Sequence, residues 1–371
     1  MGPGDPGQGP GWGFGAFTVV TVPVRLRDDL AGLPTYVAGR TVPGAVKLAS
    51  NEMPLPPLPA VLTAVARAAE VGNRYPDIAV TTLTARLAEH HGVATARIAV
   101  GCGSVALCGQ LVQAVCAPGD EVVYAWRSFE AYPIVTLTGH ATAVPVPLTP
   151  EHVHDLDAMA AAITPRTRMV IVCNPNNPTG TAVGEDALRA FIARVPEDVL
   201  VVLDEAYREF VTDPDVPDGL GLAAEFDNVC VLRTFSKAHR LAGLRVGYAV
   251  GPAELAAALR GVSVPFSVSA PAQAAALAAL DHLDELLADC AGAVTEVDRM
   301  TSALRTLGYE VPPSQANFVW LPLGTRAVGF AEHALENKVV VRAFDGSGVR
   351  VSAGTPEEVD LFLAAAGSFA R

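Results

Sequence analysis

Three continuous apolar segments constrain the fold of this 371-residue chain more than any other feature. They span Met169–Cys173, Val199–Leu203 and Val229–Leu232, and all three are rich in valine. Continuous apolar strands with helical segments between them are typical of a parallel sheet that is buried on both faces. The sequence therefore predicts an α/β protein with a large, mostly parallel sheet.

Polar residues follow each of these segments. Asn177 comes shortly after the first segment, Asp204 directly after the second, and Lys237 shortly after the third. In sheets of this kind, ligands bind beyond the carboxyl ends of the strands. We therefore expect one pocket to contain all three side chains.

Lys237 is a candidate nucleophile. Lysine occurs at only three positions, Lys47, Lys237 and Lys338, in a chain that otherwise uses arginine. An amine can lose its proton and attack a carbonyl group, which an arginine side chain cannot do. Ser236 and Arg245 flank Lys237, so the pattern indicates a Schiff-base lysine beside a phosphate clamp. The alternative is a surface lysine that follows a buried strand.

Composition and charge exclude several classes of partner. The formal net charge of −13 argues against nucleic acid or an anionic membrane as a partner, and no apolar segment reaches the length of a membrane span. The six cysteines occur singly, so we expect reduced, mostly buried thiols in a cytoplasmic protein and no metal site. His152 and His154 lack ligand partners at metal-binding spacing, and we predict that both lie on the surface.

The length of the chain allows two domains with sizeable cores. The glycine- and proline-rich N-terminus has no basic region typical of a signal peptide. We expect a disordered tail at 1–24, a lead-in joining the small domain at 25–48, a large cofactor-binding domain at 49–264 and a small α+β domain at 265–371. Within the last of these we predict helices over 270–287 and 291–307 and strands over 317–321, 339–342 and 349–352.

The polar residues around Lys237 match the needs of an aldehyde cofactor with a protonated ring nitrogen. A carboxylate at the end of a buried strand can keep that nitrogen protonated, and Asp204 is placed to do so. Asn177 and Tyr207 can donate hydrogen bonds to the oxygen on the ring. Phe129 can cover the face of the ring.

A phosphate group on the cofactor needs a cation and free N–H groups. Arg245 and Ser236 can supply part of this site. The glycine-rich turn at Gly103-Ser104 opens a predicted helix, whose N–H groups and dipole favour an anion. Such turns also occur merely because glycines pack tightly. Taken together, this set of residues predicts pyridoxal 5'-phosphate as the cofactor.

The chain resembles the fold-type-I aminotransferases of the histidinol-phosphate aminotransferase family from about Leu30 to its C-terminus. The segments that carry the resemblance are Asn51-Glu52, Asn73-Arg74-Tyr75-Pro76, Asn176 to Gly180, Asp204 to Tyr207, Ser236-Lys237 and Leu241 to Arg245. The resemblance implies a homodimer in which Tyr75 reaches the cofactor phosphate of the neighbouring subunit. It also implies that Arg350 binds the anionic group of the substrate.

These arguments together define the expected site. The expected catalytic residues are Lys237, Asp204 and Tyr207. The expected cofactor-binding residues are Gly103, Ser104, Val105, Phe129, Asn177, Asp204, Tyr207, Thr234, Ser236, Lys237, Arg245 and Tyr75. The expected substrate-binding residues are Asn51, Asn177, Arg350 and Arg342.

Within the family, the chain is most similar to the aromatic amino acid aminotransferase branch. The similarity lies in Gly101 to Cys108, Trp126 to Glu130 and Ser314 to Trp320. The resemblance implies ping-pong transamination, through a Schiff base, between phenylalanine or tyrosine and 2-oxoglutarate. The first alternative is histidinol-phosphate aminotransferase, and the second is a pyridoxal-phosphate lyase or decarboxylase. A protein that only binds the cofactor is disfavoured by the complete set of site residues.

One segment departs from the family pattern. Ala238-His239-Arg240 stands where relatives usually have a small residue, an aromatic residue and glycine. An arginine in place of this glycine, close to Lys237, is expected to affect the loop.

Overall fold

The computed structural model describes residues 24, 27, 32–33 and 39–369. The chain forms two units, Met1–Leu33 and Pro34–Arg371, and the second contains all the described helices and sheets. Apart from Val24, the tail expected at 1–24 lies outside the described residues, as does part of the lead-in at 25–48. Because 34–371 form one compact unit, the division into domains at 264 remains a prediction.

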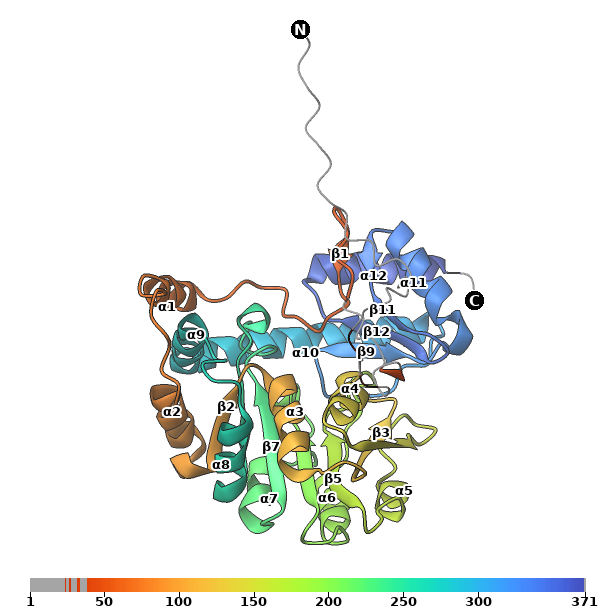
Figure 1. Ribbon diagram of the computed structural model, residues 1–371. Helices are drawn as coiled ribbons and strands as arrows, with labels where there is room; N and C mark the ends of the chain where they lie inside the picture. The colour runs from red at the N-terminus through yellow and green to blue at the C-terminus, as the bar shows by residue number, and fades with distance from the viewer. Residues whose placement is uncertain (1–23, 25–26, 28–31, 34–38, 370–371) are drawn as a thin grey trace. The chain divides into compact units, whose positions relative to one another are not determined.

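A seven-stranded sheet forms the centre of this unit (Figure 1). Its strands, in spatial order, are β2 (Ile98–Gly101), β8 (Gly247–Val250), β7 (Val229–Thr234), β6 (Leu200–Asp204), β5 (Thr167–Cys173), β3 (Glu121–Trp126) and β4 (Thr142–Pro147). Neighbouring strands from β7 to β4 are parallel, whereas β8 is antiparallel to both β7 and β2. The predicted mostly parallel sheet is therefore confirmed.

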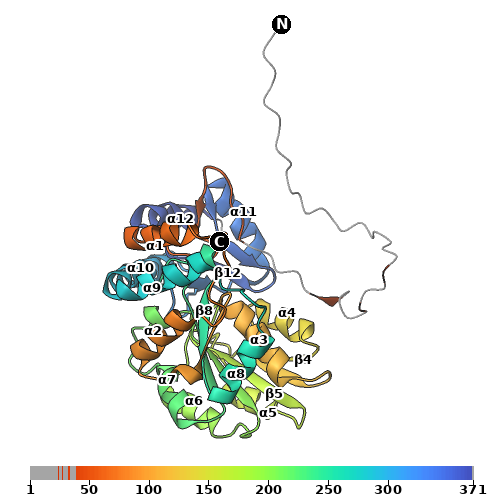
Figure 2. The ribbon, with the colours of Figure 1, turned by 60° about the vertical axis from the view of Figure 1, so that its left-hand side comes forward.

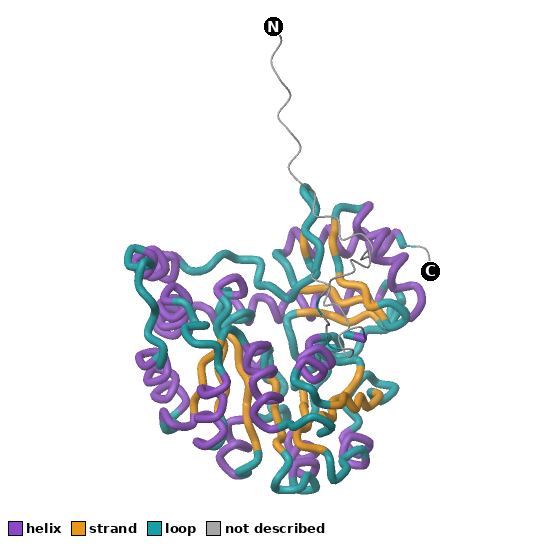
Figure 3. Tube along the Cα trace, in the orientation of Figure 1, coloured by secondary structure: helices purple, strands orange, loops and turns teal. Residues whose placement is uncertain are grey.

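Helices cover both faces of this sheet, as Figures 2 and 3 show. Successive side chains of a strand point to opposite faces, so β5 packs Ile171 against one helical layer and Val170 against the other. The first layer includes α3 (Ser104–Val115), α4 (Ala131–Thr138) and α8 (Ala253–Val262). The second includes α5 (Leu156–Ala161), α6 (Glu185–Ile192) and α7 (Gly219–Glu225). Two-sided burial explains why the middle parts of β5, β6 and β7 (Met169–Cys173, Leu200–Leu203 and Val229–Leu232) are continuously apolar.

Two further helices lie beside the β2 edge of the sheet. They are α1 (Pro59–Ala69) and α2 (Thr81–His91), and both pack with α9 (Ala270–Asp281) in one apolar cluster. The long helix α10 (Leu283–Thr306) leads from α9 to the C-terminal strands (Figure 1).

The C-terminal part contains a three-stranded antiparallel sheet of order β11 (Arg342–Phe344), β12 (Gly348–Ser352) and β9 (Phe318–Leu321). It packs in one core with α10, α11 (Ala327–Glu336) and α12 (Pro356–Ser368). The short strand β1 (Val46–Lys47) pairs in parallel with β10 (Val339–Val340). Helix α12 begins with a capping box, in which the Thr355 hydroxyl accepts from Glu358 N and the Glu358 carboxylate accepts from Thr355 N.

Three sequence-based expectations were wrong. The helix expected over 270–287 ends at Asp281, because His282 has non-helical dihedrals (φ −119°, ψ 30°) before α10 begins. The strand expected over 339–342 is split between two sheets, since β10 pairs with β1 and β11 pairs with β12. His154 was expected at the surface but is only 5 % exposed, and this burial lowers its pKa to about 4. Among the described helices, none is long and apolar enough to cross a membrane.

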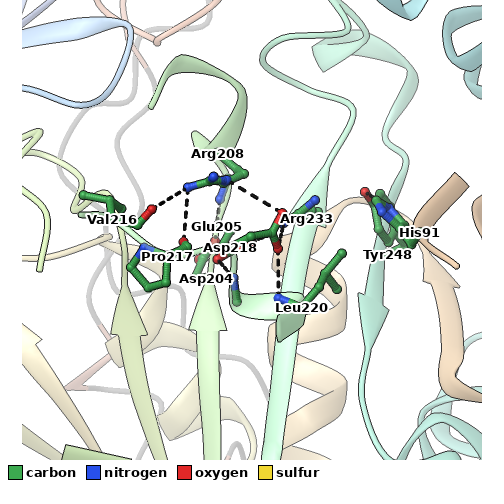
Figure 4. A network of polar contacts seen from close by, with 12 residues as sticks. His91, Asp204, Glu205, Arg208, Val216, Pro217, Asp218, Leu220, Arg233 and Tyr248 are labelled. Carbon is green, nitrogen blue, oxygen red and sulfur yellow. Dashed lines mark hydrogen bonds and ion pairs between the residues drawn. The ribbon is translucent and has the colours of Figure 1, made fainter. Parts of the chain in front are cut away.

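A buried ion-pair network joins the ends of β6 and β7. Glu205 accepts two hydrogen bonds from Arg233, from Nε at 3.0 Å and from Nη2 at 2.7 Å, and both side chains are buried. Arg233 Nη2 also donates to Asp218 at 2.6 Å. Figure 4 shows Arg208 beside this group, donating to the carbonyl oxygens of Val216 and Pro217. The network joins the end of β6, where Asp204 lies, to the end of β7, which precedes Lys237.

We predict that Arg233→Met lowers the free energy of unfolding by about 3–5 kcal/mol, because it leaves the Glu205 charge buried without its cation. Urea unfolding measures this loss. The control is Arg194→Met, which removes an exposed ion pair with Asp157 and should cost at most about 1 kcal/mol. Equal, small losses in both variants would show that the buried network does not hold the strand ends.

Candidate active site

A cavity of about 440 Å³ opens beyond the carboxyl ends of the central strands. The last residues of β5, β6 and β7, which are Cys173, Asp204 and Thr234, line its floor. Most of the expected site residues line this cavity: Asn51, Ser104, Val105, Phe129, Asn177, Asp204, Tyr207, Thr234, Ser236, Lys237, Arg245, Arg342 and Arg350. The strand ends and the C-terminal sheet thus contribute to the same space.

Lys237 lies in the loop after β7, and its Nζ donates a hydrogen bond of 3.1 Å to the Ser50 carbonyl oxygen. Burial, together with the positive charges of Arg350 and Arg245, lowers the pKa of this amine to about 7. A large fraction of Lys237 is therefore neutral near pH 7, which is the form that attacks a carbonyl carbon.

Asp204 ends β6 as a buried carboxylate. Burial raises the pKa of Asp204, while hydrogen bonds from the Tyr132 hydroxyl and the Ala206 backbone oppose this shift. The residues before and after Asp204 alternate across the sheet, so Glu205 joins the network of Figure 4 on the opposite face.

A cationic side chain, two hydroxyl groups and a helix N-terminus come together where β7 and α3 meet the cavity. The Ser236 hydroxyl accepts from Arg245 Nη1 at 3.3 Å and from the Thr234 hydroxyl at 2.9 Å. Helix α3 begins at Ser104, and no described side chain caps its first N–H groups. Gly103 has φ +81°, and a Cβ atom at this position would overlap the Arg245 guanidinium. Glycine is therefore required for Arg245 to approach the helix N-terminus.

Two arginines from the C-terminal sheet face the cavity. Arg342 and Arg350 are paired across β11 and β12. Arg350 donates hydrogen bonds to the Asn177 side-chain oxygen and, at 2.8 Å, to the Ala49 carbonyl oxygen. Arg342 forms an ion pair with Glu130 at 2.7 Å.

Aromatic and amide groups complete the wall. The Arg350 guanidinium lies 5.6 Å from the ring centroid of Phe344, which also lines the cavity. The Asn51 side chain donates a hydrogen bond of 2.8 Å to the Tyr207 hydroxyl, which connects the segment after β1 to the end of β6.

Two expected site residues lie outside the cavity lining. Gly103 contributes through its contact with Arg245, as described above. Tyr75 is 81 % exposed, and its ring stacks on Phe266 with centroids 4.4 Å apart.

Sequence reasoning missed three contacts of the site. Glu130 pairs with Arg342, Phe344 forms part of the wall, and Tyr132 binds Asp204. The available signal for Tyr132 was its position in the segment from Phe129 that leads into a helix directly after a buried strand.

The unusual segment next to Lys237 keeps the backbone that glycine would adopt. Arg240 has φ +60°, a conformation that is uncommon for residues other than glycine. Its side chain is only 6 % exposed and forms an ion pair with Asp289 of α10. It also donates a hydrogen bond of 2.9 Å to the Pro56 carbonyl oxygen. The arginine therefore points away from the cavity and anchors the loop.

Comparison with known proteins agrees with this architecture. Residues 43–365 match the family model described as aminotransferase class I and II. The aromatic amino acid aminotransferase of Nocardia farcinica is 56 % identical over 342 residues, covering 91 % of this chain and 96 % of the relative. That of Streptomyces coelicolor is 56 % identical over 351 residues, covering 94 % and 98 %.

Solved structures of aminotransferases have the same fold. Histidinol-phosphate aminotransferase from Sinorhizobium meliloti, solved in complex with pyridoxal-5'-phosphate, superposes with a TM-score of 0.84 at 29 % identity, covering 94 % of this chain and 98 % of that one. The expected fold-type-I architecture is confirmed. The chain belongs to the aminotransferase class I and II family.

Proposed function

We propose that this protein is a pyridoxal-phosphate-dependent aminotransferase that transfers the amino group of phenylalanine or tyrosine to 2-oxoglutarate. The observation that carries the proposal is the convergence of Lys237, Asp204 and Arg350 on one cavity. The relatives named aromatic amino acid aminotransferase, 54–56 % identical over most of the chain, support the choice of substrate.

The residues of the cavity fit this cofactor. Lys237 offers a buried amine with a pKa of about 7, and Asp204 offers a buried carboxylate for the ring nitrogen. Arg245 and Ser236, beside the N-terminus of α3, form a cradle for the phosphate. When bound, the cofactor withdraws electrons from the α carbon of the amino acid.

Asn177, Tyr207 and Phe129 would orient the ring. Asn177 and Tyr207 line the cavity and would donate hydrogen bonds to the ring oxygen. Phe129 lines the same cavity and would lie against one face of the ring. Val105 and Thr234 would add contacts around the phosphate end.

Lys237 would have two tasks. Its Nζ would first hold the cofactor covalently, which requires the neutral amine. Once the substrate amine has displaced it, Nζ would take the proton from the substrate α carbon as a general base. The lowered pKa suits both tasks near pH 7.

Arg350 would bind the carboxylate that phenylalanine, tyrosine and 2-oxoglutarate share. A planar guanidinium holds a carboxylate through two parallel hydrogen bonds. Asn177 is already in contact with Arg350 and would share this role, with Asn51 nearby. Arg342 is paired with Glu130, so it would act at the outer part of the substrate pocket.

Histidinol-phosphate aminotransferase remains the second candidate, because a structural relative carries that name. Histidinol phosphate has no carboxylate, so Arg350 would have to bind its phosphate instead. Comparing kcat/KM for phenylalanine and for histidinol phosphate, each with 2-oxoglutarate, decides between the two. We expect phenylalanine to be preferred, and the reverse order would replace the first proposal with the second.

We also propose that the enzyme is a cytoplasmic homodimer. Tyr75 and Phe266 form an exposed aromatic stack, with Ile78 and Val264 exposed close by in sequence. Exposed apolar groups of this kind mark protein interfaces, and a second copy would let Tyr75 reach the partner's phosphate cradle. All six cysteines are unpaired, which supports a reducing compartment.

Lys237→Ala should abolish turnover and the covalent attachment of the cofactor. The phosphate cradle is retained, so the cofactor should still bind non-covalently. Steady-state assays with phenylalanine and absorbance of the bound cofactor measure the two effects. Lys338→Ala, at an exposed lysine, is the control and should behave as wild type. Near-normal turnover of the Lys237 variant would refute the proposed chemistry.

Arg350→Lys should raise KM and lower kcat together, because lysine cannot reproduce the two-point contact with a carboxylate. We expect kcat/KM to fall by about 10- to 100-fold, the loss of one strong charged hydrogen bond. The fall should be similar for phenylalanine, tyrosine and 2-oxoglutarate. Arg326→Lys, at an exposed position, is the control. Unchanged kinetics would remove Arg350 from the substrate site.

Tyr75→Phe should weaken retention of the cofactor, because a cross-subunit hydrogen bond to the phosphate is lost. Co-expressed Tyr75→Phe and Lys237→Ala chains should form heterodimers in which one site has both an intact lysine and an intact tyrosine. Such mixtures should therefore recover part of the activity. A fully active, monodisperse monomer in analytical ultracentrifugation would disprove the cross-subunit role.

A further inference from the structure

Among the described residues, Tyr132 forms the shorter of two hydrogen bonds to the Asp204 carboxylate. Its hydroxyl donates to Asp204 Oδ2 at 2.7 Å, whereas the Ala206 backbone N–H donates to Oδ1 at 3.3 Å. The tyrosine is 1 % exposed and the aspartate 5 % exposed. Because hydrogen bonds to charged groups are strong when short and buried, the hydroxyl is the main stabiliser of this carboxylate.

The tyrosine ring is held from two sides. Its centroid lies 5.8 Å from that of Tyr124 on β3 and 5.6 Å from that of Phe129, in an edge-to-face arrangement with the latter. Tyr132 belongs to α4, and Phe129 lies just before this helix, where its carbonyl oxygen accepts a hydrogen bond of 3.0 Å from Tyr132 N. The hydroxyl therefore has a fixed direction.

Among the titratable groups around Asp204, Tyr132 is the one whose side chain donates a hydrogen bond to the carboxylate. The titratable groups facing it are Cys108 on α3, Cys173 on β5, Tyr132 on α4, and Tyr207 and Lys237 in the loops after β6 and β7. Burial raises the pKa of Tyr132 well above its usual value, so the hydroxyl keeps its proton and donates it in a hydrogen bond.

We propose that Tyr132 is a positioning residue for amino transfer, which keeps Asp204 ionised and oriented so that the carboxylate holds the proton on the cofactor's ring nitrogen. The inference rests on the proposed function. Without the hydroxyl, a carboxylate in this buried site would take up a proton itself, because its charge would lack its strongest partner. A protonated Asp204 cannot stabilise a positive charge on the ring.

The test compares binding of pyridoxamine 5'-phosphate with that of its 1-deaza analogue, which has a C–H group in place of the ring nitrogen. Tyr132→Phe should weaken binding of the natural compound about tenfold, the loss of roughly one charged hydrogen bond. The affinity of Tyr132→Phe for the deaza analogue should stay within about twofold of the wild-type affinity. Tyr124→Phe removes a hydroxyl from the same aromatic cluster without touching Asp204, and it should change neither affinity.

Kinetics give an independent readout. Tyr132 does not belong to the cavity lining, so Tyr132→Phe should lower kcat for phenylalanine about tenfold and leave KM nearly unchanged. Equal weakening of both ligands would show that the residue serves the fold only. Unchanged affinities and unchanged kcat would also overturn the inference.

Asp204→Asn separates this inference from the proposed function. If Asp204→Asn weakens pyridoxamine phosphate but not the deaza analogue, while Tyr132→Phe affects neither, only the role of Tyr132 is refuted. If Asp204→Asn changes the affinity for both ligands equally, Asp204 is not the partner of the ring nitrogen. The proposed function then loses one of its supports. Selective weakening by both substitutions supports the inference.

Discussion

Burial of the central strands on both faces is the constraint from which the rest of this structure follows. The middle parts of β5, β6 and β7 lie between two helical layers, so the side chains of Met169–Cys173, Leu200–Leu203 and Val229–Leu232 are apolar. Polar side chains occur where the strands end, as at Asp204 and Thr234. The same burial removes water from those groups, lowering the pKa of Lys237 to about 7 and raising that of Asp204. One physical cause thus locates the candidate site and adjusts its acid–base properties.

Sequence reasoning captured what depends on local pattern. Valine-rich segments indicated the strands, and their ends indicated Asp204 and Lys237, which the structure brings into one cavity. It missed contacts between distant segments, such as Tyr132 with Asp204 and Arg342 with Glu130, because side-chain pairing across the fold has no periodic signal. The break between the two helices was expected after Leu287 but lies at His282, because 270–281 and 283–287 both consist mostly of residues that favour helix.

The end of β6 is held from both sides of the sheet. Asp204 faces the cavity and accepts from Tyr132, while Glu205 faces the other way and accepts from Arg233. The loop after β7 has its own anchor, because Arg240 pairs with Asp289 on α10. The left-handed backbone at Arg240 costs of order 1 kcal/mol, and the ion pair of Arg240 with Asp289 offsets this cost. Rigid support of this kind keeps reacting groups in a productive geometry.

We propose that Lys237 is the residue that binds the cofactor covalently. Borohydride reduction of the enzyme with pyridoxal phosphate, followed by digestion and mass-spectrometric mapping of the peptides, tests it directly. The chain has only two other lysines, Lys47 and Lys338, so the assignment is unambiguous. We predict a cofactor adduct on the peptide that contains Lys237 and on neither of the others. An adduct confined to Lys47 or Lys338, or no adduct at all, would contradict the account.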